Sequence, residues 1–115
     1  MPVIGQGPAI IYFWAQWCGI CSMMQGAVSA VAADYPIITV ALRSGADGEV
    51  KQYAQQKHLP WLVVNDPQGD IARIYGVKAV PALFFINPAG NIVFTSVGYT
   101  SEWGLRFRAW LAGLI

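Results

Sequence analysis

The first 33 residues of this chain carry no charged side chain, and this restricts its fold more than any other feature. A membrane-spanning helix needs about 20 consecutive, mainly apolar residues. The most apolar run here, residues 9–15, has only the length of a strand. The segment therefore predicts a buried strand followed by the buried face of a helix, and not a membrane span. It is interrupted by Gly5, Gln6, Gly7, Pro8, Gln16, Gly19, Ser22 and Gln25.

Length and composition narrow the class of protein. The 115 residues fit a single domain, 1–115. Apolar residues make up 56% and charged residues 11%, a balance that excludes intrinsic disorder. A net charge of +1 gives no long-range attraction for nucleic acid, so we expect no nucleic-acid partner. Two cysteines exclude a four-cysteine zinc site and a disulfide-stapled miniprotein.

The N-terminus shows no secretory signal, because no basic segment or small-residue cleavage site is present. The chain starts abruptly at Met1 and Pro2. Two explanations remain open at this stage. Either the protein is cytosolic, or a leader or membrane anchor has been removed.

The order of expected elements indicates an α/β fold. Strand-helix-strand units, then a hairpin and a last helix capped by Ser101, favour one sheet with helices on both faces. The apolar segments 9–14 and 37–42 are typical of strands covered on both sides. The expected strands are 9–14, 37–42, 61–64, 82–86 and 92–97, and the expected helices are 18–33, 49–57, 70–75 and 101–113.

The strongest chemical signal is the motif Cys18-Gly19-Ile20-Cys21, directly after the first strand. Cysteines three residues apart in the first turn of a helix lie close enough to bridge. Free N–H groups and the helix dipole favour a thiolate at Cys18, so we assign it as the nucleophile and the inner Cys21 as the resolving cysteine. Gly19 leaves room for a substrate backbone. Spacing alone also fits a structural pair or half a metal site, but the strand-to-helix position favours redox chemistry.

Val80-Pro81 stands at the start of the expected strand 82–86. A cis bond there would turn the chain sharply and expose the backbone of Val80 to an extended substrate. Considered alone, Pro81 favours an ordinary trans bond, because cis bonds are a small minority.

Together these motifs resemble the thioredoxin superfamily. The resemblance covers nearly the whole chain and rests on the segment from Phe13 to Cys21, on Tyr75-Gly76-Val77 and on Val80-Pro81 with the following hairpin. The long stretch before Pro81 resembles the inserted helix and strand of the TlpA-like and cytochrome c maturation branch. Residues 39–45 and 100–104 resemble the suppressor-for-copper-sensitivity D subfamily.

The resemblance implies a thioredoxin fold with a central mixed sheet and a redox-active Cys18–Cys21 disulfide, without another cofactor or a bound metal. It implies a thiol–disulfide oxidoreductase of the bacterial periplasm, anchored to the inner membrane and kept reduced by a membrane electron donor. Protein thiols and disulfides would be its substrates, and we expect a monomeric domain. The substrate would contact an exposed apolar rim of Trp17, Ile20, Val80, Pro81 and Tyr99, beside Gly98 in the turn that forms the third side of the groove.

Two departures from the superfamily pattern matter. Thioredoxins have a buried acid in the first strand, but Tyr12 occupies that position here and Gln16 is also neutral. The proton acceptor for the resolving cysteine is therefore unassigned, and water, Glu49 or Asp66 are candidates. Ile20 replaces the proline of thioredoxin, so the reduction potential cannot be carried over.

Other candidates have simpler interpretations. His58, the only histidine, is best explained as a solvated residue at the end of a surface helix. Met24 fits the core and Met23 borders it, although two methionines after two cysteines also suggest soft Cu(I) ligands. We interpret Trp103 and Trp110 as core or partly buried helix residues.

Two alternatives to a reductase stay open. One is a copper-handling module that binds Cu(I) through Cys18 and Cys21. The other is an oxidant or isomerase, because the sequence does not fix the direction of electron flow. An isomerase usually needs a dimer, and no dimerisation segment is evident from the sequence.

Overall fold

A computed structural model describes residues 7–115. The start at Met1 and Pro2, from which we considered a removed leader or anchor, lies outside them, as do Gly5 and Gln6. Nine elements follow one another: β1 (Ala9–Trp14), α1 (Gly19–Ala32), β2 (Ile37–Leu42), α2 (Asp47–Gln56), β3 (Leu62–Asp66), α3 (Asp70–Ile74), β4 (Ala82–Ile86), β5 (Ile92–Val97) and α4 (Glu102–Leu114). Within these residues, no helix has the length and apolar character needed to cross a membrane.

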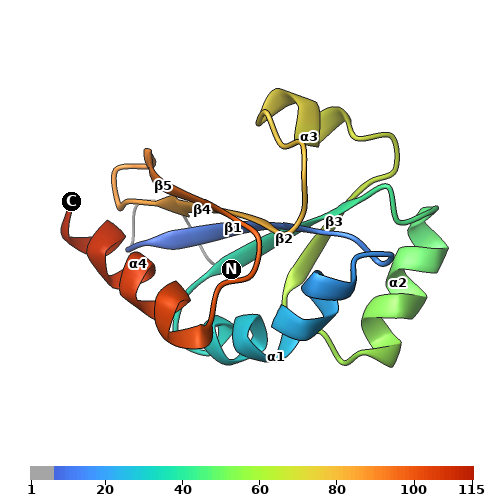
Figure 1. Ribbon diagram of the computed structural model, residues 1–115, viewed down its shortest axis with the longest axis horizontal. Coiled ribbons are helices and arrows are strands. Elements are labelled where there is room, and N and C mark those ends of the chain that lie inside the picture. Colours follow the sequence, from blue (N-terminus) through green and yellow to red (C-terminus); the bar gives the residue numbers. More distant parts are fainter. Residues whose placement is uncertain (1–6) are drawn as a thin grey trace.

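One mixed sheet organises the chain, with strand order β3-β2-β1-β4-β5. β1 is parallel to β2 and β2 to β3, while β4 is antiparallel to both β1 and β5. The helices cover both faces: α1, α2 and α4 lie on one side and α3 on the other (Figure 1). This is the thioredoxin-like α/β fold that the resemblance predicted, and α2 with β3 forms the inserted helix-strand pair.

The central strand explains the uncharged N-terminal segment. Side chains of a strand alternate between its two faces. Tyr12 and Trp14 therefore enter the larger core cluster, whereas Phe13 enters the smaller cluster on the α3 side. Both faces of β1 are buried, so the strand has almost no position for a charge.

The helix boundaries follow local chemistry. Ser101 caps α4 by accepting a hydrogen bond from the N–H of Gly104, as predicted. Gly76 follows α3 with φ of +71°, the left-handed conformation that ends helices. The third strand was expected to begin at Trp61, but β3 begins at Leu62, and Trp61 lies buried just before it.

Two tryptophan predictions are wrong. Trp103 is 79% exposed and Trp110 is 54% exposed, although we interpreted both as core or partly buried residues. The buried face of α4 consists of Leu105, Ala109 and Ala112. Small alanines bring the helix close to its neighbours, and the tryptophans point the opposite way.

Candidate active site

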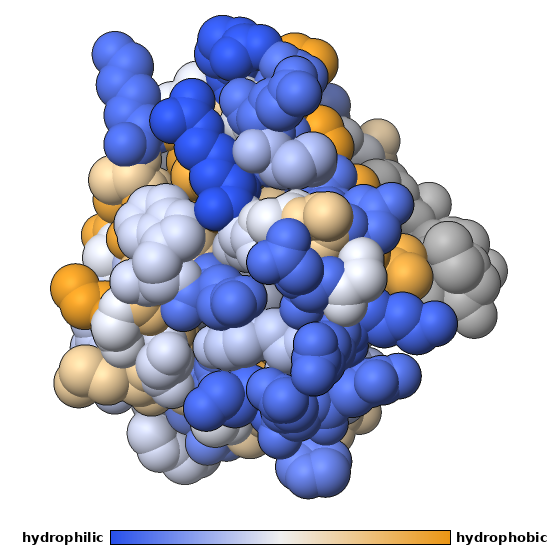
Figure 2. Space-filling view, turned by 90° about the vertical axis from the view of Figure 1, so that its right-hand side faces the viewer, coloured by the Kyte–Doolittle hydropathy of each residue, from blue (hydrophilic) through white to orange (hydrophobic). Residues whose placement is uncertain are grey.

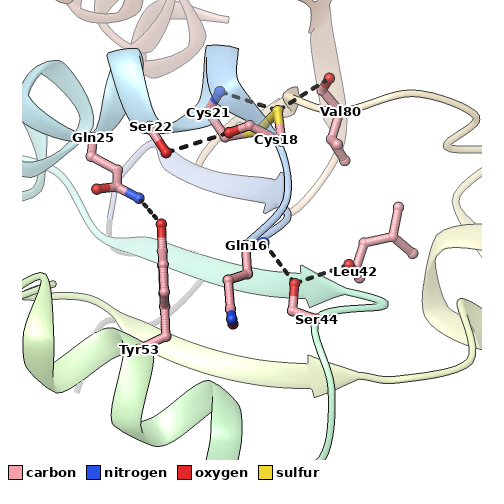
Figure 3. The surroundings of a disulfide bond; sticks show 9 residues. All are labelled: Gln16, Cys18, Cys21, Ser22, Gln25, Leu42, Ser44, Tyr53 and Val80. Atoms are coloured by element: carbon pink, nitrogen blue, oxygen red, sulfur yellow. Dashed lines mark hydrogen bonds between the residues drawn. A yellow bond between two sulfur atoms is a disulfide. The ribbon is translucent and has the colours of Figure 1, made fainter.

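The two cysteines form a disulfide at the start of α1. The Cα atoms of Cys18 and Cys21 are 5.2 Å apart. Cys18 is the N-cap residue, with extended backbone angles, and its Sγ accepts a hydrogen bond of 3.1 Å from the N–H of Cys21 (Figure 3). Helix N-caps offer unpaired N–H groups to an acceptor. The sulfur of Cys18 thus lies where the backbone stabilises negative charge.

The two sulfurs differ in access. Cys18 is 8% exposed, whereas Cys21 is completely buried. The Sγ of Cys18 lies 3.8 Å from the carbonyl oxygen of Val80, which faces it in Figure 3. An incoming sulfur atom can therefore reach Cys18 but not Cys21.

The Val80-Pro81 peptide bond is cis. The interpretation from Pro81 alone, an ordinary trans bond, is wrong, and the superfamily resemblance gave the right geometry. The carbonyl of Pro81 accepts a hydrogen bond of 2.8 Å from the N–H of Gly98. Gly98 has φ of +93°, which favours glycine, so the turn after β5 is held against the cis-proline loop.

The apolar rim is smaller than predicted. Trp17, Ile20 and Tyr99 are 63%, 47% and 58% exposed, and Val80 is partly buried. The side chain of Pro81 is fully buried, so it shapes the loop without offering contact surface. A Cβ atom on Gly19 would meet no atom within 4 Å, so the space in front of it is open.

The end of the molecule that carries this site is otherwise polar. Figure 2 faces this end and shows hydrophilic side chains over most of it, with only scattered apolar groups. The exposed side chains of the rim are therefore a local apolar feature in polar surroundings.

Sequence reasoning missed two residues that position the cysteine loop, Ser44 and Arg43. Ser44 Oγ accepts a hydrogen bond of 2.8 Å from the N–H of Gln16 and donates to the carbonyl of Leu42. The indole N–H of Trp17 donates to the carbonyl of Arg43. Parallel strands β1 and β2 end at the same edge of the sheet, so a polar residue just after β2 was the available signal.

Tyr12, at the position of the thioredoxin acid, is buried and its hydroxyl has no hydrogen-bond partner among the described residues. Burial raises the pKa of Tyr12 above its usual 10.0, and the neighbouring Tyr53 raises it further. The phenol therefore stays protonated at neutral pH and cannot accept the proton of Cys21.

The two candidate acids have different surroundings. Both carboxylate oxygens of Asp66 accept backbone hydrogen bonds from the first turn of α3, with the N–H groups of Ile71 and Ala72. Asp66 is thus occupied in holding that helix. Glu49 is exposed, accepts from the N–H of Ala46, and lines a cavity of about 390 Å³ together with Trp17. Of the two acids, Glu49 borders the active site.

The remaining candidates lie apart from this chemistry. His58 is exposed after the end of α2, as predicted. Met24 is buried in the core and Met23 is 72% exposed. Among residues 7–115, the structure brings together no group of three or more His, Cys, Asp or Glu side chains that could hold a metal ion.

Comparison with known proteins assigns the family. A sequence profile of the AhpC/TSA family matches residues 3–95. The chain belongs to this family. It is thioredoxin-like, and it is 33% identical over 106 residues to a thioredoxin-like protein of Haemophilus influenzae, covering 91% of this chain and 63% of that protein.

Two further relatives carry more specific names. The chain is 28% identical over 95 residues to a DsbE homologue, a thiol:disulfide interchange protein of Paracoccus denitrificans, covering 80% of this chain and 51% of the relative. The structure of this chain is similar to that of a secreted Mycobacterium tuberculosis disulfide oxidoreductase homologous to DsbE. The TM-score is 0.78 and the sequence identity 25%, and the match covers 94% of this chain and 84% of the other. The chain thus spans 63% of the length of the Haemophilus influenzae protein and 51% of the Paracoccus denitrificans protein.

Proposed function

We propose that this protein is a thiol–disulfide oxidoreductase that exchanges disulfides with protein substrates through Cys18 and Cys21. The observation that carries the proposal is the difference in access within the pair, 8% exposure for Cys18 against 0% for Cys21, at a helix N-terminus beside a cis-proline loop. The interchange proteins and oxidoreductases among its relatives support it.

The reaction follows from this asymmetry. The thiolate of Cys18 attacks one sulfur of a substrate disulfide, the substrate S–S bond breaks, and the released substrate thiolate takes a proton. Cys21 then loses its proton and attacks the Cys18 sulfur of the mixed disulfide. The second substrate thiol leaves, the Cys18–Cys21 disulfide forms, and two electrons have passed to the substrate. The electrons reside in the two sulfurs, so the proposal needs no further cofactor.

The substrate chain would lie against Trp17, Ile20 and Tyr99, next to the open space at Gly19. The backbone of Val80, beside Cys18, would pair with an extended substrate segment. Pairing through backbone groups gives low sequence selectivity. The turn at Gly98 would close the third side of this groove.

We further propose the direction and the setting: a reductase of the bacterial envelope, with a membrane protein as electron donor and an inner-membrane anchor in the whole protein. The names of secreted and interchange relatives support an extracytoplasmic location. The subfamily resemblance in residues 39–45 and 100–104 supports a place near the suppressor-for-copper-sensitivity D branch.

The first experiment is the reduction potential of the Cys18–Cys21 pair in a dithiothreitol or glutathione series, followed by tryptophan fluorescence. Of the five tryptophans, Trp17, directly before Cys18, should report the change. The reduction potential of thioredoxin is about −270 mV and that of a strong oxidant about −120 mV, a difference of about 7 kcal/mol for two electrons. A low value supports the reductase. A high value supports an oxidant. Failure to form a reversible disulfide, with stoichiometric Cu(I) binding, would replace the proposal by the copper-handling module.

The roles of the two cysteines are tested by substitution. Cys18→Ser should abolish disulfide exchange, and Cys21→Ser should accumulate mixed disulfides visible on non-reducing gels. If only the Cys18→Ser variant accumulated mixed disulfides, Cys21 would be the nucleophile and Cys18 the resolving cysteine.

A further inference from the structure

The outer face of α4 carries a row of large apolar side chains that nothing in the described part of the chain covers. We call it the α4 stripe; its members are Trp103, Phe107, Trp110 and Leu114, which are 79%, 57%, 54% and 63% exposed. The rings of Phe107 and Trp110 lie next to each other, with centroids 6.4 Å apart. Large apolar side chains gathered in one row mark an interaction surface, whereas single exposed ones do not.

The stripe cannot turn inward. The opposite face of α4 is fixed in the core by Leu105, Ala109 and Ala112, all completely buried. Arg106, on the flank of the helix, ties it to α1 and the segment after it through an ion pair with Asp34 and a hydrogen bond to the carbonyl of Ala30, while its second ion pair, with Glu102, lies within α4 itself. The helix is thus locked with its aromatic side facing outward.

The spacing within the stripe indicates what covers it. Successive members are separated by four, three and four residues, which is the spacing of the seam between two helices in a coiled coil. α4 carries two basic side chains and no lysine: Arg106 is paired with two acids, and Arg108 donates to the carbonyl of Gly104 on its own helix. The stripe therefore lacks the cluster of basic side chains that attracts lipid head groups. Another helix with a matching uncharged seam fits this surface better than a lipid surface.

In place of the monomer expected from the sequence, we propose that two copies of this chain form a dimer by packing their α4 stripes against each other, with the two helices antiparallel. The spacing makes the arrangement self-complementary about a two-fold axis that passes between positions 108 and 109. Trp103 then faces the partner's Leu114, and Phe107 faces the partner's Trp110. Each large ring at the ends meets a smaller side chain, and the helix dipoles oppose each other.

The available area predicts a reversible dimer. An aromatic side chain offers roughly 150–250 Å², so the exposed parts of the three rings supply on the order of 400 Å² per copy. A standard interface takes about 800 Å² from each partner. Leu114 and the flanks of α4 add to the area without reaching a large interface, so the dimer should dissociate on dilution.

The test is the mass of the oxidised protein, in which both cysteines are paired, by sedimentation or light scattering over a concentration series. The mass should rise from 12.5 kDa toward twice that value. Trp110→Lys should hold it at 12.5 kDa, and Trp103→Lys serves as a second variant if the first one misfolds. Ile74→Lys, which changes an 82% exposed residue of α3, is the matched control and should dimerise like the wild type. A wild-type mass of 12.5 kDa throughout, or a dimer that survives both stripe substitutions, would overturn the proposal.

A mixing experiment tests the antiparallel arrangement. Phe107→Glu and Trp110→Lys should each be monomeric alone, and their equimolar mixture should recover dimer because opposite charges then face each other across the axis. In a parallel dimer the same positions meet each other, so the mixture would stay monomeric and the arrangement would be wrong. A monomeric wild type that binds phosphatidylcholine vesicles and loses this with Trp110→Lys would assign the stripe to a lipid surface instead.

Discussion

Tyr12→Phe removes one buried hydroxyl and leaves the aromatic ring in place. Tyr12 is completely buried, packs edge-on against the ring of Trp61, and has a hydroxyl without a partner among the described residues. Burying a hydroxyl without a hydrogen bond costs about 1–3 kcal/mol. We therefore expect the variant to gain about 1 kcal/mol of unfolding free energy at pH 7.

The same variant should change the response to alkaline pH. The pKa of Tyr12 is raised in the folded protein, by burial first and then by Tyr53, while the unfolded chain releases this proton near pH 10. The stability tied to this proton is complete below pH 10 and is lost as the pH rises toward the folded pKa. The loss is about 1.4 kcal/mol per pH unit for the wild type and is absent in Tyr12→Phe, so the gap between them widens by about that amount at pH 11.

Urea unfolding of the oxidised protein at pH 7, 9 and 11 measures both effects. Tyr99→Phe, at a 58% exposed tyrosine, is the control at pH 7 and should leave the unfolding free energy within about 0.5 kcal/mol. A loss of 1 kcal/mol or more in Tyr12→Phe at pH 7 would mean that the hydroxyl is well bonded. Parallel pH profiles would mean that it ionises as easily in the folded protein as in the unfolded chain. Either result would refute the account of this site.

Four other substitutions test the scaffold by chemical denaturation. Asp66→Ala should cost about 2–3 kcal/mol, because a buried carboxylate that receives two backbone hydrogen bonds of α3 is lost; an effect below 1 kcal/mol would contradict this. Gly98→Ala should cost about 1 kcal/mol or more because of its φ of +93°, and unchanged stability would show that the turn can relax. Met24→Ala should cost about 2–5 kcal/mol and Met23→Ala less than 0.5 kcal/mol, since only Met24 is buried; equal effects would disprove that assignment.

Local signals in the sequence were sufficient for most of the secondary structure. The apolar runs predicted β1 and β2, and the turn at residues 87–91 predicted the hairpin of β4 and β5, with the observed bounds. Ser101 and Gly76 predicted where α4 begins and α3 ends. These signals work because capping and strand burial depend on neighbouring residues.

The candidate site was predictable only in part. The cysteine motif stands on contiguous residues, and the family resemblance added the cis bond before Pro81. The contact between Ser44 and the loop before Cys18 joins residues 28 positions apart, and the only sequence signal for it was a polar residue just after β2. Asp66 and Glu49 looked equivalent as acids until their hydrogen-bond partners were visible.

The sequence by itself determined the fold class, the position of the cysteine pair at a strand-to-helix junction and the core residues of the central strand. These features depend on periodicity and on short-range chemistry, which a single chain displays directly. Only the tertiary structure decided that Pro81 is buried, that the hydroxyl of Tyr12 has no hydrogen-bond partner among residues 7–115, and that α4 turns its alanines inward and its tryptophans outward. Which face of a helix is buried depends on how closely it approaches the sheet, and small residues allow a close approach that a hydrophobicity pattern does not reveal.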